Sequence, residues 1–147
     1  MPFPTDPRSA LGPLLSQTTR LWRKAVDQRL QPFGLTEATW LPLLRLSRAP
    51  QALRQKELAA SLSLDSSAVV RLLDTLQAAG LIERREEEAD RRAKAILLTP
   101  AGQKLVDQVE AISAEVREEL LSGLSDDEIS TAFRTIRQIC DRLEARS

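Results

Sequence analysis

The sequence predicts a mostly α-helical fold that carries one small β-hairpin. Two observations support this prediction. Apolar residues recur at helical spacing over most of the chain, and between residues 81 and 98 this spacing gives way to two short apolar runs around a charged segment. With 147 residues, of which 42% are apolar and 29% charged, the chain is long enough to bury a core without disulfides.

The first two predicted helices are separated by a turn at Gln31–Gly34. The first begins at Asp6-Pro7, where a capping carboxylate precedes a proline whose missing N–H costs nothing, although Gly12-Pro13 weakens its first turns. The second is capped by Thr36, and Pro42 is expected to bend it. Their apolar positions are Leu14, Leu15, Leu21, Trp22, Val26 and Leu30 in the first helix, and Trp40, Leu43, Leu44 and Leu46 in the second.

Two shorter helices follow, joined by a tight connection. The third is expected at about Gln55–Ser61, and the fourth at Asp65–Ala79, where Asp65 caps its start and Gly80 stops it. The fourth helix turns one apolar face inward, which consists of Val69, Leu72, Leu73 and Leu76.

The hairpin is expected to pair a strand at Leu81–Arg85 with one at Ala95–Leu98, and the charged residues Glu86–Lys94 form its extended tip. Two long helices follow, and the second begins with a capping box between Ser125 and Glu128. The last helix carries an apolar stripe at heptad-like spacing, which consists of Ile129, Phe133, Ile136, Cys140 and Leu143.

Two short helices joined by a tight turn form a helix-turn-helix, whose second helix can enter the major groove of DNA. Small residues open the fourth helix, so its backbone can approach base edges, and Arg71 lies one turn beyond Ser67 on the same face, within reach of a guanine. The cations of the hairpin, Arg84 among them, suit a wing that follows phosphates. Each feature also has a plainer interpretation, namely an amphipathic helix with a solvated arginine and a solvated loop of mixed charge. The residues that we expect to contact DNA are Ser66, Ser67, Ala68, Arg71, Arg85, Asp90, Arg91, Arg92 and Lys94.

Several motifs resemble the MarR family of winged helix-turn-helix regulators over nearly the whole chain. They are Leu58-Ala59 through Leu76, Ala79–Arg84, Asp90–Lys94 and Leu98–Gly102, of which the Asp-Arg-Arg-Ala-Lys wing followed by Leu-Thr is the most specific. A further set is similar to the SlyA-like branch, although several positions of the recognition helix depart from that pattern. This set consists of Leu21-Trp22-Arg23, Asp27, Arg29-Leu30, Leu35-Thr36 and Trp40.

The resemblance implies a homodimer that binds a pseudo-palindromic double-stranded DNA operator as a repressor or anti-silencer. It implies that Ser67, Ala68 and Arg71 face the bases. It also implies that Asp90 orients Arg92 and that one arginine of the Arg91–Arg92 pair enters the minor groove, with the choice between the two left open.

The predicted organisation is a winged helix-turn-helix DNA-binding region at 35–104 within an all-helical dimerisation region formed by 1–34 and 105–147. The stripe of the last helix is too short for a free coiled coil, so it needs partners. These lie either in a second chain, which a two-fold operator favours, or inside one chain. The residues expected in the dimer interface are Leu14, Leu21, Ile129, Phe133, Ile136, Cys140 and Leu143.

A small phenolic or benzoate-like anion is the effector that the resemblance implies. Arg20 and Arg23 share one face of the first helix, and an arginine beside an aromatic wall suits a carboxylate on a ring. We expect Trp40 and Leu44 to complete this site, although Trp40 as a core residue beside solvated arginines is the plainer interpretation. Cys140 occupies an apolar helix position, which indicates packing rather than a redox sensor.

Other classes of function find little support in the composition. The chain has no histidine and one cysteine, and it lacks a phosphate-cradling glycine loop, so we expect no enzyme activity, no metal site and no cofactor. No apolar run approaches membrane-span length and the N-terminus lacks a signal-peptide pattern, which leaves the cytoplasm as the expected location. The net charge is zero, with the basic excess before residue 105. The remaining alternative is a winged-helix module that binds another protein through the glutamates of the hairpin tip.

Overall fold

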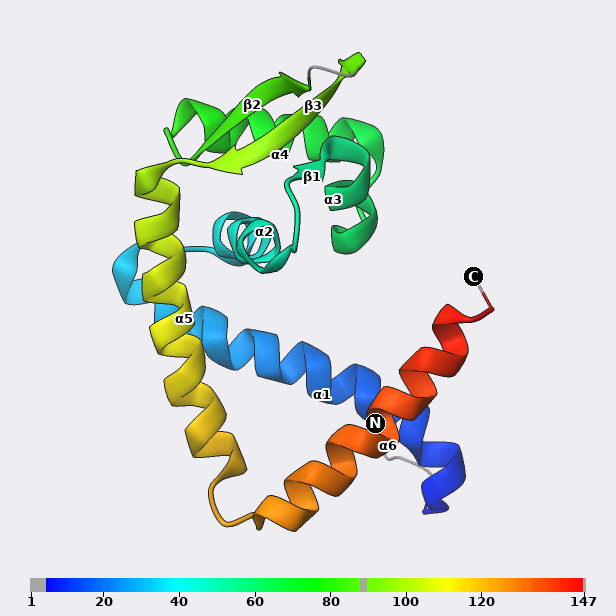
Figure 1. The fold of residues 1–147 in the computed structure, drawn as a ribbon. Helices are drawn as coiled ribbons and strands as arrows, with labels where there is room; N and C mark the ends of the chain where they lie inside the picture. The colour runs from blue at the N-terminus through cyan, green and yellow to red at the C-terminus, as the bar shows by residue number, and fades with distance from the viewer. Residues whose placement is uncertain (1–4, 88–89, 147) are drawn as a thin grey trace. The chain divides into compact units, whose positions relative to one another are not determined.

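The computed structural model describes residues 5–87 and 90–146, with the backbone alone at residues 87 and 90–93. The fold is mostly helical with a small antiparallel sheet, as predicted (Figure 1). Within the described residues, no helix combines the length and apolarity that crossing a bilayer requires. The elements in chain order are α1 (Pro7–Leu30), η1 (Gln31–Phe33), α2 (Glu37–Arg48), β1 (Leu53–Arg54), α3 (Gln55–Leu62), α4 (Ser66–Ala78), β2 (Ile82–Glu87), β3 (Asp90–Leu98), α5 (Pro100–Leu121) and α6 (Asp126–Glu144).

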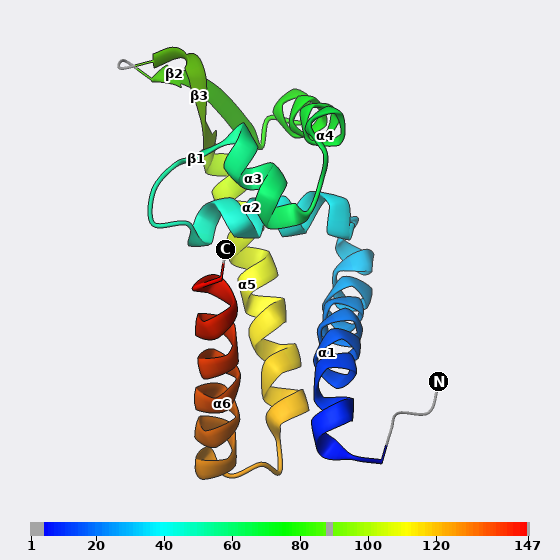
Figure 2. The ribbon, with the colours of Figure 1, turned by 90° about the vertical axis from the view of Figure 1, so that its right-hand side faces the viewer.

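The chain divides into two compact units, Met1–Ser113 and Ala114–Ser147. The first unit contains α1, the helix-turn-helix formed by α3 and α4, the sheet and most of α5 (Figure 2). The second contains the end of α5 and all of α6, which the Ser125–Glu128 capping box opens as predicted, with both of its hydrogen bonds formed.

The predicted start of α1 is confirmed. Asp6 caps the helix, and its carboxylate accepts hydrogen bonds from the Ser9 backbone N–H at 3.0 Å and the Ser9 hydroxyl at 2.8 Å. The helix then continues through Gly12 and Pro13 without a break. Pro13 is the seventh residue of α1, so its missing N–H costs the helix one hydrogen bond, to the Ser9 carbonyl four residues earlier, without ending it.

The start and interior of α2 follow the sequence in part. Thr36 occupies the capping position, but its hydroxyl lies 3.4 Å from that of Thr39 and does not bind a backbone N–H of the helix. Pro42 lies inside the helix and is buried beside Leu43 and Leu44. The pyrrolidine ring of Pro42 therefore contributes to the core of the first unit.

The sheet has the order β1–β3–β2, with both pairs antiparallel. The two-residue strand β1 was not predicted, since Leu53 and Arg54 are too few to form a pattern of their own and are fixed by pairing with Ile96 and Ala95. Figure 1 shows this sheet beside α4, and α3, α4 and the strands share one core. We call α3, α4 and the sheet the head. Its core consists of Leu58, Val69, Leu73, Leu76, Ile82 and Ile96.

The hairpin is longer than predicted. Strand pairing continues past the expected end at Arg85 to the Glu87–Asp90 pair, with an irregular register between Glu86 and Glu87. Hydrogen bonds between strands need only backbone groups, so a charged ribbon can pair beyond the two short apolar runs that predict the strands.

Gly102, at the start of α5, is required by a close backbone approach. A Cβ placed there would clash with the carbonyl oxygen of Leu81, which already accepts a hydrogen bond from the Thr99 N–H at 3.1 Å. We expect Gly102→Ala to destabilise the protein by roughly 1–3 kcal/mol, since backbone must move to relieve the overlap. Urea denaturation measures this change. Gly12→Ala is the control, because the same added methyl meets no atom within 4 Å, and an equal loss in both variants would contradict the prediction.

Candidate nucleic-acid interface and ligand cavity

The first turn of α4 is held by its capping residue, Asp65. The Asp65 carboxylate accepts hydrogen bonds from the Ala68 N–H at 2.7 Å and the Ser67 hydroxyl at 2.9 Å. These two bonds, with a smaller contribution from the charge of Arg71, lower the pKa of Asp65. Because the folded pKa is depressed, the cap stabilises α4 at neutral pH and is lost as acidification protonates the carboxylate.

The predicted base-reading residues share this end of α4. Ser66, Ser67 and Arg71 are exposed, whereas Ala68 is half-buried against the rest of the head. Although the Ser67 hydroxyl donates its proton to Asp65, its oxygen can still accept a hydrogen bond from a base. Arg71 forms no ion pair among the described residues, which leaves its guanidinium available to DNA.

The cations of the wing do not lie on one face. In the β2–β3 register Arg85 faces Ala95, while Lys94 faces Glu86, so Arg85 and Lys94 point to opposite sides of the ribbon. Arg85 also forms an ion pair with Glu83 at 2.5 Å. Arg84, which we had grouped with the wing cations, is directed at α4 instead, where its guanidinium contacts Asp74.

The remaining predicted wing contacts cannot be located in the same way. The backbone of Asp90, Arg91 and Arg92 belongs to β3, but their side chains lie outside the described part of the structure. Their proposed roles at the minor groove therefore stay predictions.

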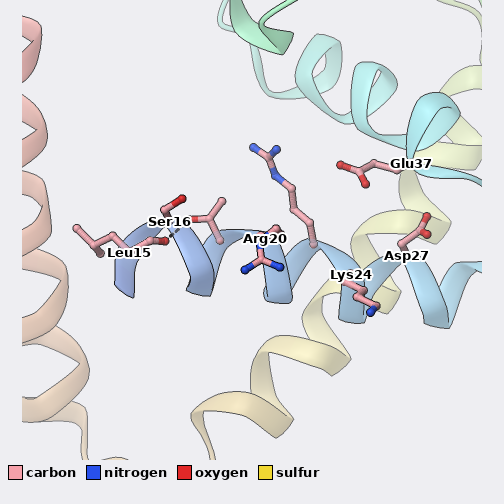
Figure 3. A pocket seen from close by; sticks show the side chains of 8 residues that line it. Leu15, Ser16, Arg20, Lys24, Asp27 and Glu37 are labelled. Atoms are coloured by element: carbon pink, nitrogen blue, oxygen red, sulfur yellow. Dashed lines mark hydrogen bonds between the residues drawn. The ribbon is translucent and has the colours of Figure 1, made fainter. Parts of the chain in front are cut away.

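A cavity of about 760 Å³ lies between α1 and the start of α2. Figure 3 shows residues of α1 along one side of the cavity and Glu37 projecting toward it from α2. Its cations, Arg20, Arg23 and Lys24, form no ion pair with the described residues. The lining holds these three cations against two carboxylates, so it carries a small net positive charge beside an apolar residue. The full lining is Leu15, Ser16, Thr19, Arg20, Arg23, Lys24, Asp27 and Glu37.

The structure brings Arg20 and Arg23 together as predicted, but it does not place Trp40 or Leu44 in the lining. These two side chains are only 2% and 5% exposed, because they lie on the face of α2 that packs into the core. Trp40 is instead connected to the cavity through Asp27, whose carboxylate accepts a hydrogen bond from the indole Nε1–H at 3.0 Å.

Other cavity residues were missed from the sequence. Ser16, Thr19, Lys24 and Asp27 follow the spacing of three or four residues that relates Arg20 to Arg23, so extending that spacing along the helix would have found them. Glu37 comes from another helix, and no local pattern indicated it.

Arg45 adds to the positive charge near the cavity. Its Nε is buried and has no hydrogen-bond partner among the described residues. Burial, followed by the positive charges of Arg23 and Arg48, lowers the pKa of Arg45. Arg48 is neutralised by Glu110, which it contacts through two hydrogen bonds of 3.2 Å, whereas Arg23 and Arg45 have no such partner within the part of the chain that the structure describes.

Comparison with known proteins places this fold in one family. The sequence signature of the MarR family matches residues 33–93. The transcriptional regulator PA3341 is 41% identical to this chain with a TM-score of 0.83, and the match covers 92% of this chain and 98% of that one. CouR from Rhodococcus jostii RHA1, whose structure contains p-coumaroyl-CoA, is 28% identical with a TM-score of 0.75, over 92% of this chain and 95% of its own.

The comparison also includes a structure with DNA. MepR from S. aureus, in complex with DNA, is 28% identical with a TM-score of 0.73, over 89% of this chain and 96% of its own. Each of these matches covers at least 95% of the relative and at least 89% of this chain, so the similarity is not confined to the helix-turn-helix. The chain belongs to the MarR family of winged helix-turn-helix transcription regulators, which bind DNA and are not enzymes.

Proposed function

We propose that the protein is a homodimeric repressor or anti-silencer that binds a pseudo-palindromic operator and is released by a small aromatic anion. The observation that carries the DNA part is the exposed first turn of α4, where small residues and an ion-pair-free Arg71 lie together. The similarity of Leu21-Trp22-Arg23 to the SlyA-like branch leads us to propose that branch, without its operator sequence.

The proposed DNA contacts divide into base reading and positioning. Ser66, Ser67, Ala68 and Arg71 face the major groove, and Arg71 binds guanine through two hydrogen bonds. On the wing, Arg85 and Lys94 contact phosphates from opposite faces of the ribbon, while Asp90 orients Arg92 and one arginine of the Arg91–Arg92 pair enters the minor groove. In this proposal residues 35–104 are the DNA-binding region.

The proposed dimerisation region consists of residues 1–34 and 105–147. No residue of α6 is buried in the single chain, although its apolar stripe is strongly segregated from its charged face. Phe133 and Ile136 are 66% and 43% exposed, and exposed apolar faces of this kind mark interaction sites. The other interface residues that we propose are Leu14, Leu21, Ile129, Cys140 and Leu143. Since the Cys140 thiol lies 3.6 Å from the Glu144 carboxylate and is half-buried, we assign it to packing.

The proposed effector binds in the cavity of α1. Three cations without ion-pair partners outnumber the carboxylates of Asp27 and Glu37 and favour an anion, and Leu15 supplies an apolar contact for a ring. CouR, a relative of the same fold, was solved with p-coumaroyl-CoA, which joins an aromatic acyl group to an anionic carrier. A phenolic or aromatic carboxylate is therefore the ligand class that we propose.

The DNA proposal is tested with a fluorescent duplex that contains the region upstream of the protein's own gene. Fluorescence anisotropy titrations measure the affinity at several salt concentrations. We expect the logarithm of the association constant to fall linearly with the logarithm of the salt concentration, with a slope of about −0.9 per phosphate contact. We expect Arg71→Ala to reduce the ratio of specific to nonspecific affinity by roughly 5- to 150-fold, because about 1–3 kcal/mol of base discrimination is lost.

Arg8→Ala serves as the matched control, since Arg8 is an exposed arginine of α1 that belongs neither to the proposed DNA contacts nor to the cavity lining. It should leave the discrimination ratio unchanged. A salt-independent affinity would favour the protein-binding module, and unchanged discrimination in Arg71→Ala would remove that residue from the reading surface.

A further inference from the structure

One guanidinium joins the wing to the recognition helix. On β2, Arg84 donates a hydrogen bond from Nη2 to the Asp74 carboxylate and another from Nε to the Gln77 side-chain oxygen, both at 2.6 Å. Asp74 and Gln77 are three residues apart on α4, so they share a face of that helix. We call these three residues the α4–wing brace.

The strand register explains why Arg84 reaches α4 and its neighbour Arg85 does not. Arg84 pairs with Ile96, and Ile82 lies two residues earlier on the same face of β2. Ile82 and Ile96 are buried, so this face of the sheet packs inward. The Arg84 side chain is consequently only 22% exposed, whereas that of Arg85, on the opposite face, is 66% exposed.

We propose that Arg84 is a positioning residue that sets the orientation of α4 relative to the wing, with Asp74 and Gln77 as its anchors. This inference rests on the proposed DNA contacts. A protein that places a helix in the major groove and a wing against the adjacent backbone needs both elements at a fixed angle, because a displacement of either lengthens hydrogen bonds that act only over a narrow range of distance.

Electrostatics makes the role of Asp74 testable. Its carboxylate is 60% exposed on the helix that we place in the groove of a polyanion. As an isolated charge it would repel phosphates, and its removal would strengthen DNA binding. As part of the α4–wing brace it holds α4 in place, and its removal weakens binding. The two roles predict changes of opposite sign.

The experiment measures operator affinity for Asp74→Ala, Arg84→Ala and the double variant. Alanine retains the helical propensity of α4, and circular dichroism with thermal melting checks that each variant is folded. We expect each single variant to bind roughly 3- to 30-fold more weakly, and the double variant to bind no more weakly than either single one, since each change removes the same interaction. The slope of affinity against salt should match that of the unchanged protein.

Glu86→Ala is the control, because it removes an exposed acid from the wing and no contact with α4. It should bind as tightly as the unchanged protein or more tightly. Tighter binding by Asp74→Ala would overturn the positioning role. A salt slope lowered by about 0.9 in Arg84→Ala, with losses that add in the double variant, would identify Arg84 as a phosphate contact instead. If the Asp74→Ala and Arg84→Ala variants bind the operator as tightly as the unchanged protein and Glu86→Ala do, only this inference fails. If no protein binds, the proposed function fails with it.

Discussion

Phe133→Glu is expected to separate the two chains of the proposed dimer and to lower operator affinity by roughly 100-fold or more. Two linked heads bind two half-sites with an effective concentration that adds about 10²–10⁴ to the affinity of one head, and a monomer loses this gain. Phe133 is 66% exposed in the single chain, so a charged side chain at this position should leave α6 itself folded. Between two chains, the same charge would be buried without a partner.

Sedimentation velocity and operator anisotropy measure the two effects on the same samples. Gln138→Glu is the matched control, because it introduces the same charge at an exposed position of α6 that lies off the apolar stripe. It should remain dimeric. A Phe133→Glu protein that stays dimeric and binds the operator at full strength would show that the interface lies elsewhere.

Arg23→Gln is expected to weaken the binding of an aromatic carboxylate by roughly 10- to 150-fold. A hydrogen bond between a carboxylate and a charged donor contributes about 1.5–3 kcal/mol, and Arg23 lines the cavity without an ion-pair partner among the described residues. Isothermal titration calorimetry with benzoate, salicylate and cinnamate-type acids measures the change. Arg8→Gln controls for the loss of one positive charge from α1, and equal losses in both variants would contradict a site built on Arg23.

The hydrogen bond between Asp27 and Trp40 links the cavity to α2. Asp27 lines the cavity and also accepts the indole hydrogen bond of Trp40, which belongs to the core of α2. Ligand binding beside Asp27 can therefore bias the position of α2, provided that the ligand binds the two arrangements with different affinity. A ligand that binds in calorimetry and leaves operator affinity unchanged would separate the cavity from regulation.

Much of the fold follows from local sequence. Asp6, Asp65 and the Ser125–Glu128 pair begin their helices as predicted, because a cap is formed by residues within four positions of each other. The stop at Gly80 is local in the same sense, since its φ of 76° is one that glycine adopts without strain. The hairpin, too, was predicted from its two short apolar runs, although its length was not.

The candidate site depended more on tertiary structure. The sequence by itself determined that α4 opens with small residues before Arg71, and that Arg20 and Arg23 share a helical face, because both statements need only the geometry of one helix. Only the packed chain decided that Trp40 is a core residue rather than part of the cavity lining, that Glu37 borders the cavity, and that the Nε of Arg45 is buried. It likewise decided that neighbouring arginines of β2 differ, so that Arg84 anchors α4 while Arg85 faces solvent. The reason is that helical and strand periods fix which residues share a face, whereas the element that covers each face is chosen by contacts between residues far apart in the chain.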